Sequence, residues 1–257
     1  MSPDTWMHFD AQGALLESAR DCEAEVFHKW FGNTREQLDE EYGPYEDSSV
    51  FLVLADRYDE VLGAVRLIAP GGRAGLKTLV DVGGEPWNVD GARSAAAVGI
   101  HLASTWEVAT LGVRHASSAS GQRLSLALYH GLIIAARANQ ASSFVAILDE
   151  QVRHLLSSVG FPTLQLPGTT TAPYLGSAAS TPVYAHCATL FENQRRQFPD
   201  AHRLVTLGVG LDGVAVPTVE NFRLRPHDDE VEFVVLDEQA RSHRSVAPEG
   251  SALVGQP

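Results

Sequence analysis

The sequence predicts a mixed α/β domain in which helices flank a central sheet around one core. Apolar residues make up 44% of its 257 residues, which is enough for one sizeable core. Short apolar runs with strand character alternate along the chain with longer stretches of helical periodicity. Turns that contain Gly or Pro separate these elements, and no internal repeat interrupts them. This order is typical of layered α/β folds.

The first part of the chain predicts one helix followed by a hairpin of two strands. Apolar residues recur at helical spacing over residues 11–31, and a Gly-Asn pair stops the helix. Residues 36–47 are acidic and contain a Gly-Pro pair, so a loop is expected there. The apolar runs 50–55 and 61–68 are separated by a short polar turn, which predicts an antiparallel pair of strands.

Strands and helices alternate after a less regular segment, residues 73–103. Within that segment, residues 76–82 fit a short helix or a strand, and residues 95–102 fit a helix. The expected strands that follow are 105–113, 143–148, 163–166 and 182–188. The expected helices between and after them are 124–139, 150–159 and 189–197.

The pattern divides the chain into a main domain and a C-terminal extension. Residues 1–200 contain the regular elements and are expected to form the main domain. Residues 201–237 are expected to add short strands, packed on the same domain, at 203–209, 214–219 and 231–236. Residues 238–257 are polar and contain Pro and Gly, so we expect a disordered tail.

The charge and the cysteine content argue against several classes of function. A net charge of −13 disfavours broad binding to nucleic acid or to an anionic membrane, because both need a basic surface. Cys22 and Cys187 lie far apart, so no disulfide framework is expected. The chain shows no signal-peptide pattern and no apolar run that could span a bilayer, which predicts a cytoplasmic protein. The ten histidines lack metal-binding spacing, so no metal is expected.

A series of residues in the first half of the chain follows a distinctive order. Arg20, Phe27 and Trp30 lie on the first predicted helix, ahead of the acidic loop. The second hairpin strand carries Gly-Ala-Val-Arg-Leu at 63–67, and the next strand carries Trp-Glu at 106–107. Together with the elements that follow, this order resembles the acyl-homoserine-lactone synthases and the N-acyl amino acid synthases of the GNAT superfamily.

The resemblance extends from about residue 20 to about residue 191 and has two departures. Where the family carries Ser-Arg after the central glutamate, this chain has Ala109 and Thr110, which argues against a homoserine lactone product. Where GNAT proteins carry a glycine-rich phosphate loop, residues 114–121 contain a single glycine, Gly121. Such a loop would bind a pyrophosphate poorly, which fits an acyl-carrier-protein donor. Coenzyme A as the donor is not excluded.

The resemblance implies an N-acyltransferase with a largely antiparallel central sheet that is splayed at its central strand. Such an enzyme moves an acyl group from an acyl-carrier-protein or coenzyme A thioester to a small amino-acid-like amine by direct attack, with no permanently bound cofactor. A fatty or other long acyl group is expected, because the apolar helix over residues 124–136 could wall a tunnel.

The resemblance also places the donor along and beyond the central strand. The backbone at the end of that strand would receive the pantetheine arm as an added strand. Two arginines around the following loop would bind the phosphate of the arm and attract an acidic carrier protein. The donor site is thereby expected at Leu111, Gly112, Val113, Arg114, Gly121 and Arg123.

Catalytic and acceptor roles fall on other side chains. Glu107 would act as a base or position a water, although strand alternation could equally put it on a solvated face. Tyr184 would protonate the leaving thiolate, with Tyr174 as the alternative. The acceptor or acyl side is assigned to Arg20, Phe27, Trp30, Asp47 and Arg66. Because a half-buried guanidinium needs an acidic partner, Arg66 is expected to pair with Asp47 or Glu46, for a structural or a loop-ordering role.

Two other functions stay open. An ordinary acetyl-CoA-dependent GNAT acetyltransferase would have a shallow acyl pocket and a tight phosphate nest. A catalytically silent, GNAT-shaped binding protein would account for the departures at Ala109 and Thr110. The sequence also leaves open a homodimer, and whether residues 201–257 extend the sheet, mediate that dimer or cover the acceptor site.

Overall fold

The computed structural model describes residues 3–115 and 118–224. Contacts group Met1–Arg223 into one unit and Leu224–Pro257 into a second. The strand predicted at 231–236 and the tail predicted at 238–257 lie outside the described residues. Within the described ranges, every helix is too short or too polar to cross a bilayer.

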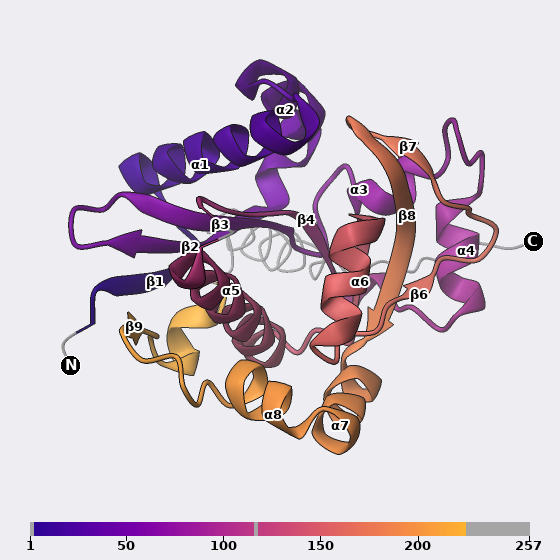
Figure 1. The fold of residues 1–257 in the computed structure, drawn as a ribbon. Helices are drawn as coiled ribbons and strands as arrows, with labels where there is room; N and C mark the ends of the chain where they lie inside the picture. Colours follow the sequence, from indigo (N-terminus) through magenta and orange to yellow (C-terminus); the bar gives the residue numbers. More distant parts are fainter. Residues whose placement is uncertain (1–2, 116–117, 225–257) are drawn as a thin grey trace, which may run out of the picture. The chain divides into compact units, whose positions relative to one another are not determined.

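One sheet orders the first unit (Figure 1). Its strands follow the order β6-β8-β5-β4-β3-β2-β1-β9, and β7 pairs with β8. Among the described residues the strands are β1 (Thr5–Phe9), β2 (Ser49–Asp56), β3 (Val61–Ile68), β4 (Thr105–Val113), β5 (Ser143–Asp149), β6 (Leu164–Gln165), β7 (Ala172–Tyr174), β8 (Ser177–His186) and β9 (Val214–Ala215). Neighbours pair antiparallel, except that β4 with β5 and β1 with β9 are parallel. The predicted largely antiparallel sheet is confirmed.

Helices cover both faces of this sheet (Figure 1). One face carries α1 (Gly13–Phe31), α2 (Arg35–Tyr42), α3 (Lys77–Asp81) and α4 (Gly91–Ala97). The other carries α5 (Ala119–Ala138), α6 (Glu150–Ser158) and α7 (Cys187–Gln197), after which comes the short α8 (Pro199–Ala201). Alternation along β4 sets this division, because Thr110 bonds to Glu23 of α1 whereas Leu111 packs with Tyr129 of α5.

Helix α2 occupies much of the acidic segment in which a loop was expected. Thr34 and Gln37 form a capping box, which satisfies backbone N–H groups at the start of the helix. Arg35 then pairs with Asp39 one turn later. The helix also buries Leu38 and Tyr42, which lie four residues apart on one face. Strands β1 and β7 were also not predicted.

The C-terminal extension differs from the strands predicted for it. The strand expected at 203–209 is wrong, because His202–Thr206 forms a π-helical turn. The consecutive residues Leu204 and Val205 both pack against α5, which an alternating strand would not allow. The strand expected at 214–219 is reduced to the two residues of β9.

The sheet separates between β4 and β5, as the resemblance implies. The two strands pair only over residues 105–107 and 143–145. Beyond this point each continues without pairing to the other, β4 as far as Val113 and β5 as far as Asp149. A gap therefore opens in the middle of the sheet, directly after Glu107.

A β-bulge in β4 accompanies this separation. On the side that faces β3, Thr110 pairs with Arg66 and Val108 pairs with Leu67, which leaves Ala109 without a partner. A bulge bends its strand and increases the local twist. The bend at Ala109 accounts for the divergence of β4 from β5 at the same level.

Candidate active site

An apolar cavity lies between the sheet and helices α5, α6 and α7. Its walls include Tyr129, Leu132, Ile133, Leu156, Phe161, Leu190 and Phe191, and strands β5 and β8 add Phe144, Ala146, Val183 and Ala185. About 810 Å³ of non-atom space lies between these walls, and part of it is open solvent at the mouth. Because its surface is almost wholly apolar, it suits a hydrocarbon chain.

An aromatic pocket lies on the opposite face of the sheet, near the end of α1. Four aromatic residues line it, namely Phe27, Phe31, Tyr42 and Tyr174. Its polar lining residues are Thr110, Asp149, Ser177 and Ser180. Asp149 is the one charged residue of this lining within the described part of the chain. The pocket thus suits a ligand that has both an apolar part and a polar head.

The apolar cavity and the aromatic pocket meet at the gap between β4 and β5. Val108 and Leu111 of β4, Leu148 of β5 and Val152 of α6 line both spaces. A molecule held in the gap would therefore reach both faces of the sheet at once.

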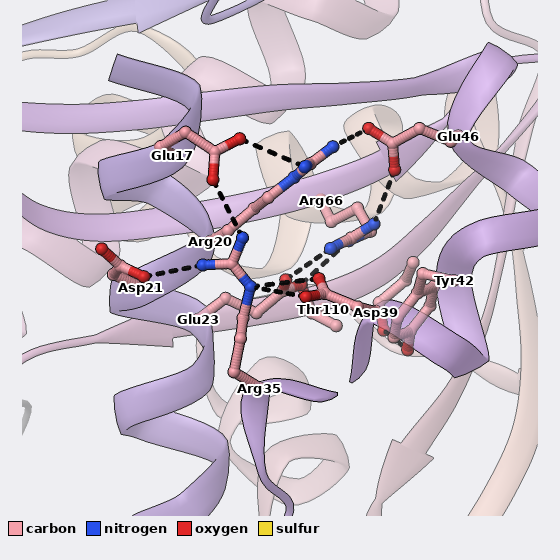
Figure 2. A network of polar contacts seen from close by, with 11 residues as sticks. Glu17, Arg20, Asp21, Glu23, Arg35, Asp39, Tyr42, Glu46, Arg66 and Thr110 are labelled. Atoms are coloured by element: carbon pink, nitrogen blue, oxygen red, sulfur yellow. Dashed lines mark hydrogen bonds and ion pairs between the residues drawn. The ribbon is translucent and has the colours of Figure 1, made fainter. Parts of the chain in front are cut away.

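A buried ion pair between Arg66 of β3 and Glu23 of α1 supports the aromatic pocket from behind (Figure 2). Arg66 Nε and Nη2 donate to the two carboxylate oxygens of Glu23 at 3.0 and 2.6 Å. The guanidinium carbon lies 4.5 Å from the ring centroid of Tyr42 and 4.7 Å from that of Phe51. The Thr110 hydroxyl donates to the same carboxylate. Since Tyr42 and Thr110 line the pocket, this pair holds its wall in place.

Arg66 therefore has a different principal partner from the two expected. Glu46 makes only a longer contact with it, at 3.6 Å from Nη1. Asp47 pairs instead with the exposed Arg73, at 3.2 Å. Both loop carboxylates lie toward the surface, whereas the buried face of α1 brings Glu23 directly onto the guanidinium.

Solved structures with a similar arrangement of elements are acyltransferases. FeeM, an N-acyl amino acid synthase from uncultured soil microbes, has a TM-score of 0.54 at 14% identity, over 75% of this chain and 96% of that one. BjaI, a CoA-dependent acyl-homoserine lactone synthase with SAM and isopentyl-CoA, has a TM-score of 0.53 at 15% identity, over 86% and 97%. The acyl-homoserine lactone synthase LasI has a TM-score of 0.52 at 11% identity, over 72% and 91%. No protein-family model and no curated protein matches this chain.

This chain has the GNAT fold. The resemblance inferred from its residues is thereby confirmed at the level of the fold. At 11–15% identity the likeness extends to the fold alone, and the chemistry depends on this chain's own residues.

Of the residues assigned to the acceptor side, Phe27 lines the aromatic pocket of this GNAT fold. Trp30, by contrast, is 59% exposed. The second aromatic residue of α1 in the pocket is Phe31, because residues four apart, such as Phe27 and Phe31, share a helix face. Arg20 pairs with Glu17 of α1 and with Glu46 of the 3-10 segment Gly43–Ser48 (Figure 2). Neither Arg20, Trp30 nor Asp47 is part of the lining of either space.

Glu107 is buried at the last paired position before the gap. Its side chain is not on a solvated face, since the residue is only 3% exposed. Its two carboxylate oxygens accept hydrogen bonds from the backbone N–H and the hydroxyl of Thr78, both at 2.9 Å. Burial raises the pKa of this carboxyl to about 7. Glu107 is not part of the lining of either space. It therefore lies close to the gap but behind the residues that line it.

The raised pKa of Glu107 predicts a pH-dependent stability. A carboxyl that binds its proton more tightly when folded stabilises the protein below its ordinary pKa of 4.5, and this stability is lost as pH rises toward 7. The loss is expected to reach up to about 3 kcal/mol. The Glu107→Gln variant lacks this titrating carboxyl. As the pH rises from 4.5 to 7, its free energy of unfolding should therefore fall less than that of the wild type. Urea unfolding at several pH values measures both. Glu40 is exposed, so the free energy of unfolding of Glu40→Gln should change with pH as that of the wild type does. If Glu107→Gln showed the same pH dependence as the wild type, the effect of burying Glu107 would be contradicted.

A buried lysine cluster, which the sequence did not reveal, adjoins Glu107. The Lys77 ammonium contacts the carboxylates of Glu41 and Asp81 and lies 2.9 Å from the Tyr174 hydroxyl. The Tyr174 hydroxyl in turn donates to Asp81. Burial and the Asp81 carboxylate raise the pKa of Tyr174 well above its ordinary range, which keeps the phenol protonated. The i,i+4 spacing of Lys77 and Asp81 was the one local signal for this cluster.

The two candidate tyrosines lie at different places. Tyr184 pairs with Val145 across β5 and β8, and its ring lies 5.5 Å from that of His186. It contributes to the lining of the apolar cavity. Tyr174 lines the aromatic pocket. Both tyrosine side chains nevertheless pack in one apolar cluster around Trp87, so they lie on the same face of the sheet.

The predicted donor strand lies along the open edge of the gap. Leu111 lines both spaces, and Gly112 and Val113 continue β4 beyond it. Gly112 is required here because a Cβ atom would lie 2.9 Å from Val26 of α1. The residue thus lets α1 approach β4 closely and close off this side of the pocket.

The two predicted phosphate-binding arginines line one hollow near the start of α5, together with Arg57 and His115. Arg114 pairs with Glu25 at 2.7 Å and with Glu60 at 3.2 Å. Arg123 donates to the Asp212 carbonyl at 3.2 Å. The Gly121 N–H donates to Ser118 Oγ at 3.0 Å, so the serine cap already occupies it. The structure brings the arginines together, but their charges are partly matched by protein groups.

Proposed function

We propose that this protein is an N-acyltransferase in which a thioester enters the gap between β4 and β5 and acylates a small amine. The meeting of the apolar cavity and the aromatic pocket at that gap carries the proposal. A thioester carbonyl in the gap would extend its acyl chain into the cavity and face an amine in the pocket. Holding both reactants in this way favours direct attack, with no covalent enzyme intermediate.

The proposed donor is a thioester of phosphopantetheine, on coenzyme A or on an acyl carrier protein. From Val108 to Val113, β4 has no strand partner on its β5 side. Its free backbone groups can pair with the amides of a pantetheine arm as they would with an added strand. Arg114 and Arg123 suit the phosphate that both donors share. The neighbour BjaI, a CoA-dependent synthase, supports the coenzyme A alternative.

The apolar lining of the cavity favours a fatty or other long acyl group over acetyl. Each methylene buried there is worth about 0.8 kcal/mol, and the cavity offers almost no polar atom for any other group. Helix α5 contributes Tyr129, Leu132 and Ile133 to this lining.

The proposed reaction exchanges a C–S bond for a C–N bond. The amine nitrogen bonds to the thioester carbonyl carbon, the C–S bond breaks, and the thiolate leaves. Two protons leave the ammonium nitrogen in the course of the reaction, and one of them is returned to the thiolate. We propose Glu107 as the proton acceptor, reached through water because the carboxyl lies behind the wall, and Tyr184 as the proton donor to sulfur.

Thiol release from acyl-CoA donors, from acetyl to dodecanoyl, with a panel of amines tests the proposal. The expected result is amine-dependent release that is fastest with the longer donors, with acyl amides of matching mass. Activity confined to acetyl-CoA would instead identify an ordinary acetyltransferase. Saturable donor binding without release, for coenzyme A and carrier-protein thioesters alike, would identify a catalytically silent binding protein.

A further inference from the structure

The aromatic pocket contains a negative charge and no positive one. Asp149 lies in its lining at the end of β5, and no Lys, Arg or His within residues 3–115 and 118–224 joins it there. The carboxylate is held in a fixed position, because Oδ1 accepts from the Gln151 N–H at 2.8 Å and Oδ2 accepts from the Ser177 hydroxyl at 2.7 Å. Each oxygen keeps a further lone pair for a ligand.

The buried cations behind the pocket do not reverse this charge. Arg66 is met by the carboxylates of Glu23 and Glu46. Lys77 is met by those of Glu41 and Asp81. Glu46 also pairs with Arg20, and the connected network holds three arginines against five carboxylates, those of Glu17, Asp21, Glu23, Asp39 and Glu46. Because carboxylates outnumber cations in both clusters, the field that reaches the pocket from them is also negative.

Four aromatic residues complete the environment of Asp149. Phe27 and Phe31 have ring centroids 5.5 Å apart and form one side of the pocket, and Tyr42 and Tyr174 belong to the other elements around it. Aromatic faces attract both apolar groups and cations. A carboxylate on the ligand would be desolvated here with no cation to receive it.

We infer that the acceptor is a small arylalkylamine that carries no carboxylate, and that Asp149 binds its ammonium group. The inference rests on the proposed function, since it concerns the acceptor of the same reaction. The sequence led us to expect an amino-acid-like acceptor, and the inference specifies an amine of similar size that lacks the carboxyl group. The physical basis is that opposite charge and aromatic surface favour this ligand, whereas an amino acid would bring a second negative charge beside Asp149.

The test compares phenethylamine, L-phenylalaninamide and L-phenylalanine as acceptors for the full-length protein with decanoyl-CoA. Phenethylamine is expected to have a kcat/KM at least tenfold above that of phenylalanine, and the amide is expected to resemble phenethylamine. Phenethylamine is at least as basic as phenylalanine, so a larger share of free amine does not explain such a preference. The amide keeps the bulk of the amino acid without its charge.

Asp149→Asn, which retains a cap for α6, is expected to raise KM for phenethylamine about tenfold and to narrow the preference over phenylalanine. Glu192→Gln removes the same charge from the exposed surface of α7 and is expected to leave the preference unchanged. Acylation of phenylalanine as fast as that of phenethylamine overturns the inference but not the proposed function. The inference is also overturned if phenylalaninamide is as poor an acceptor as phenylalanine, or if folded Asp149→Asn keeps the wild-type preference for phenethylamine. If no amine is acylated, both the inference and the proposed function are overturned.

Discussion

Replacing Glu23 with alanine is expected to lower the free energy of unfolding by about 3–5 kcal/mol. The variant leaves the Arg66 guanidinium, which is 1% exposed, without its two short hydrogen bonds. It also removes the acceptor of the Thr110 hydroxyl. The guanidinium then keeps only the longer contact with Glu46, so most of its desolvation cost is no longer offset, and this cost dominates the loss. Urea unfolding followed by circular dichroism measures it.

Glu46→Ala is the matched control, because it removes the other carboxylate that contacts Arg66 (Figure 2). The Glu46 side chain is 45% exposed, so its loss is expected to cost less than about 1 kcal/mol. The double variant Glu23→Leu with Arg66→Met is expected to recover much of the stability, since an apolar pair needs no partner. Equal losses in Glu23→Ala and Glu46→Ala would contradict the buried pair.

Filling the apolar cavity is expected to change the preferred acyl chain. Ala146 lies in its lining on β5, so Ala146→Phe places a ring where a chain would extend. If the ring excludes about three methylenes at about 0.8 kcal/mol each, kcat/KM for dodecanoyl-CoA falls roughly 50-fold. Butanoyl-CoA, which has fewer methylenes to lose to the ring, should keep more of its activity than dodecanoyl-CoA. Acylation rates for the two donors with one amine measure the shift.

Ala188→Phe adds the same ring at an exposed position of α7 and is expected to leave the ratio of the two donors unchanged. Thermal unfolding of both variants separates a filled cavity from a damaged fold, because overpacking costs about 1–3 kcal/mol where no space is free. The cavity would be ruled out as the acyl site if Ala146→Phe is folded and its acylation rates with both donors equal those of the wild type.

The strands around the gap could be predicted from local sequence. β4 was expected at 105–113 and β5 at 143–148, and the structure has Thr105–Val113 and Ser143–Asp149. Both are short apolar runs between turns, and burial on both faces of a central strand produces such runs. The hairpin of β2 and β3 was predicted for the same reason.

The partners of the polar residues were harder to predict. Glu23 could have been identified as buried, since it follows Ala19 by four residues and so shares the helix face of that apolar residue. Nothing local indicates that it meets Arg66, which lies 43 residues away. Asp149 directly follows the strand expected at 143–148, but its place in the aromatic pocket depends on α1, β7 and β8.

The sequence by itself determined the central strands β2 to β5 and the long helices α1 and α5, and that Arg66 needed an acidic partner, because apolar periodicity and the cost of a buried charge are local properties. The tertiary structure alone decided that Glu23 is this partner, that Glu107 lies behind the wall, and that two cavities meet at the gap. These features depend on side chains that are far apart in the chain and meet only when the helices pack on the bulged sheet.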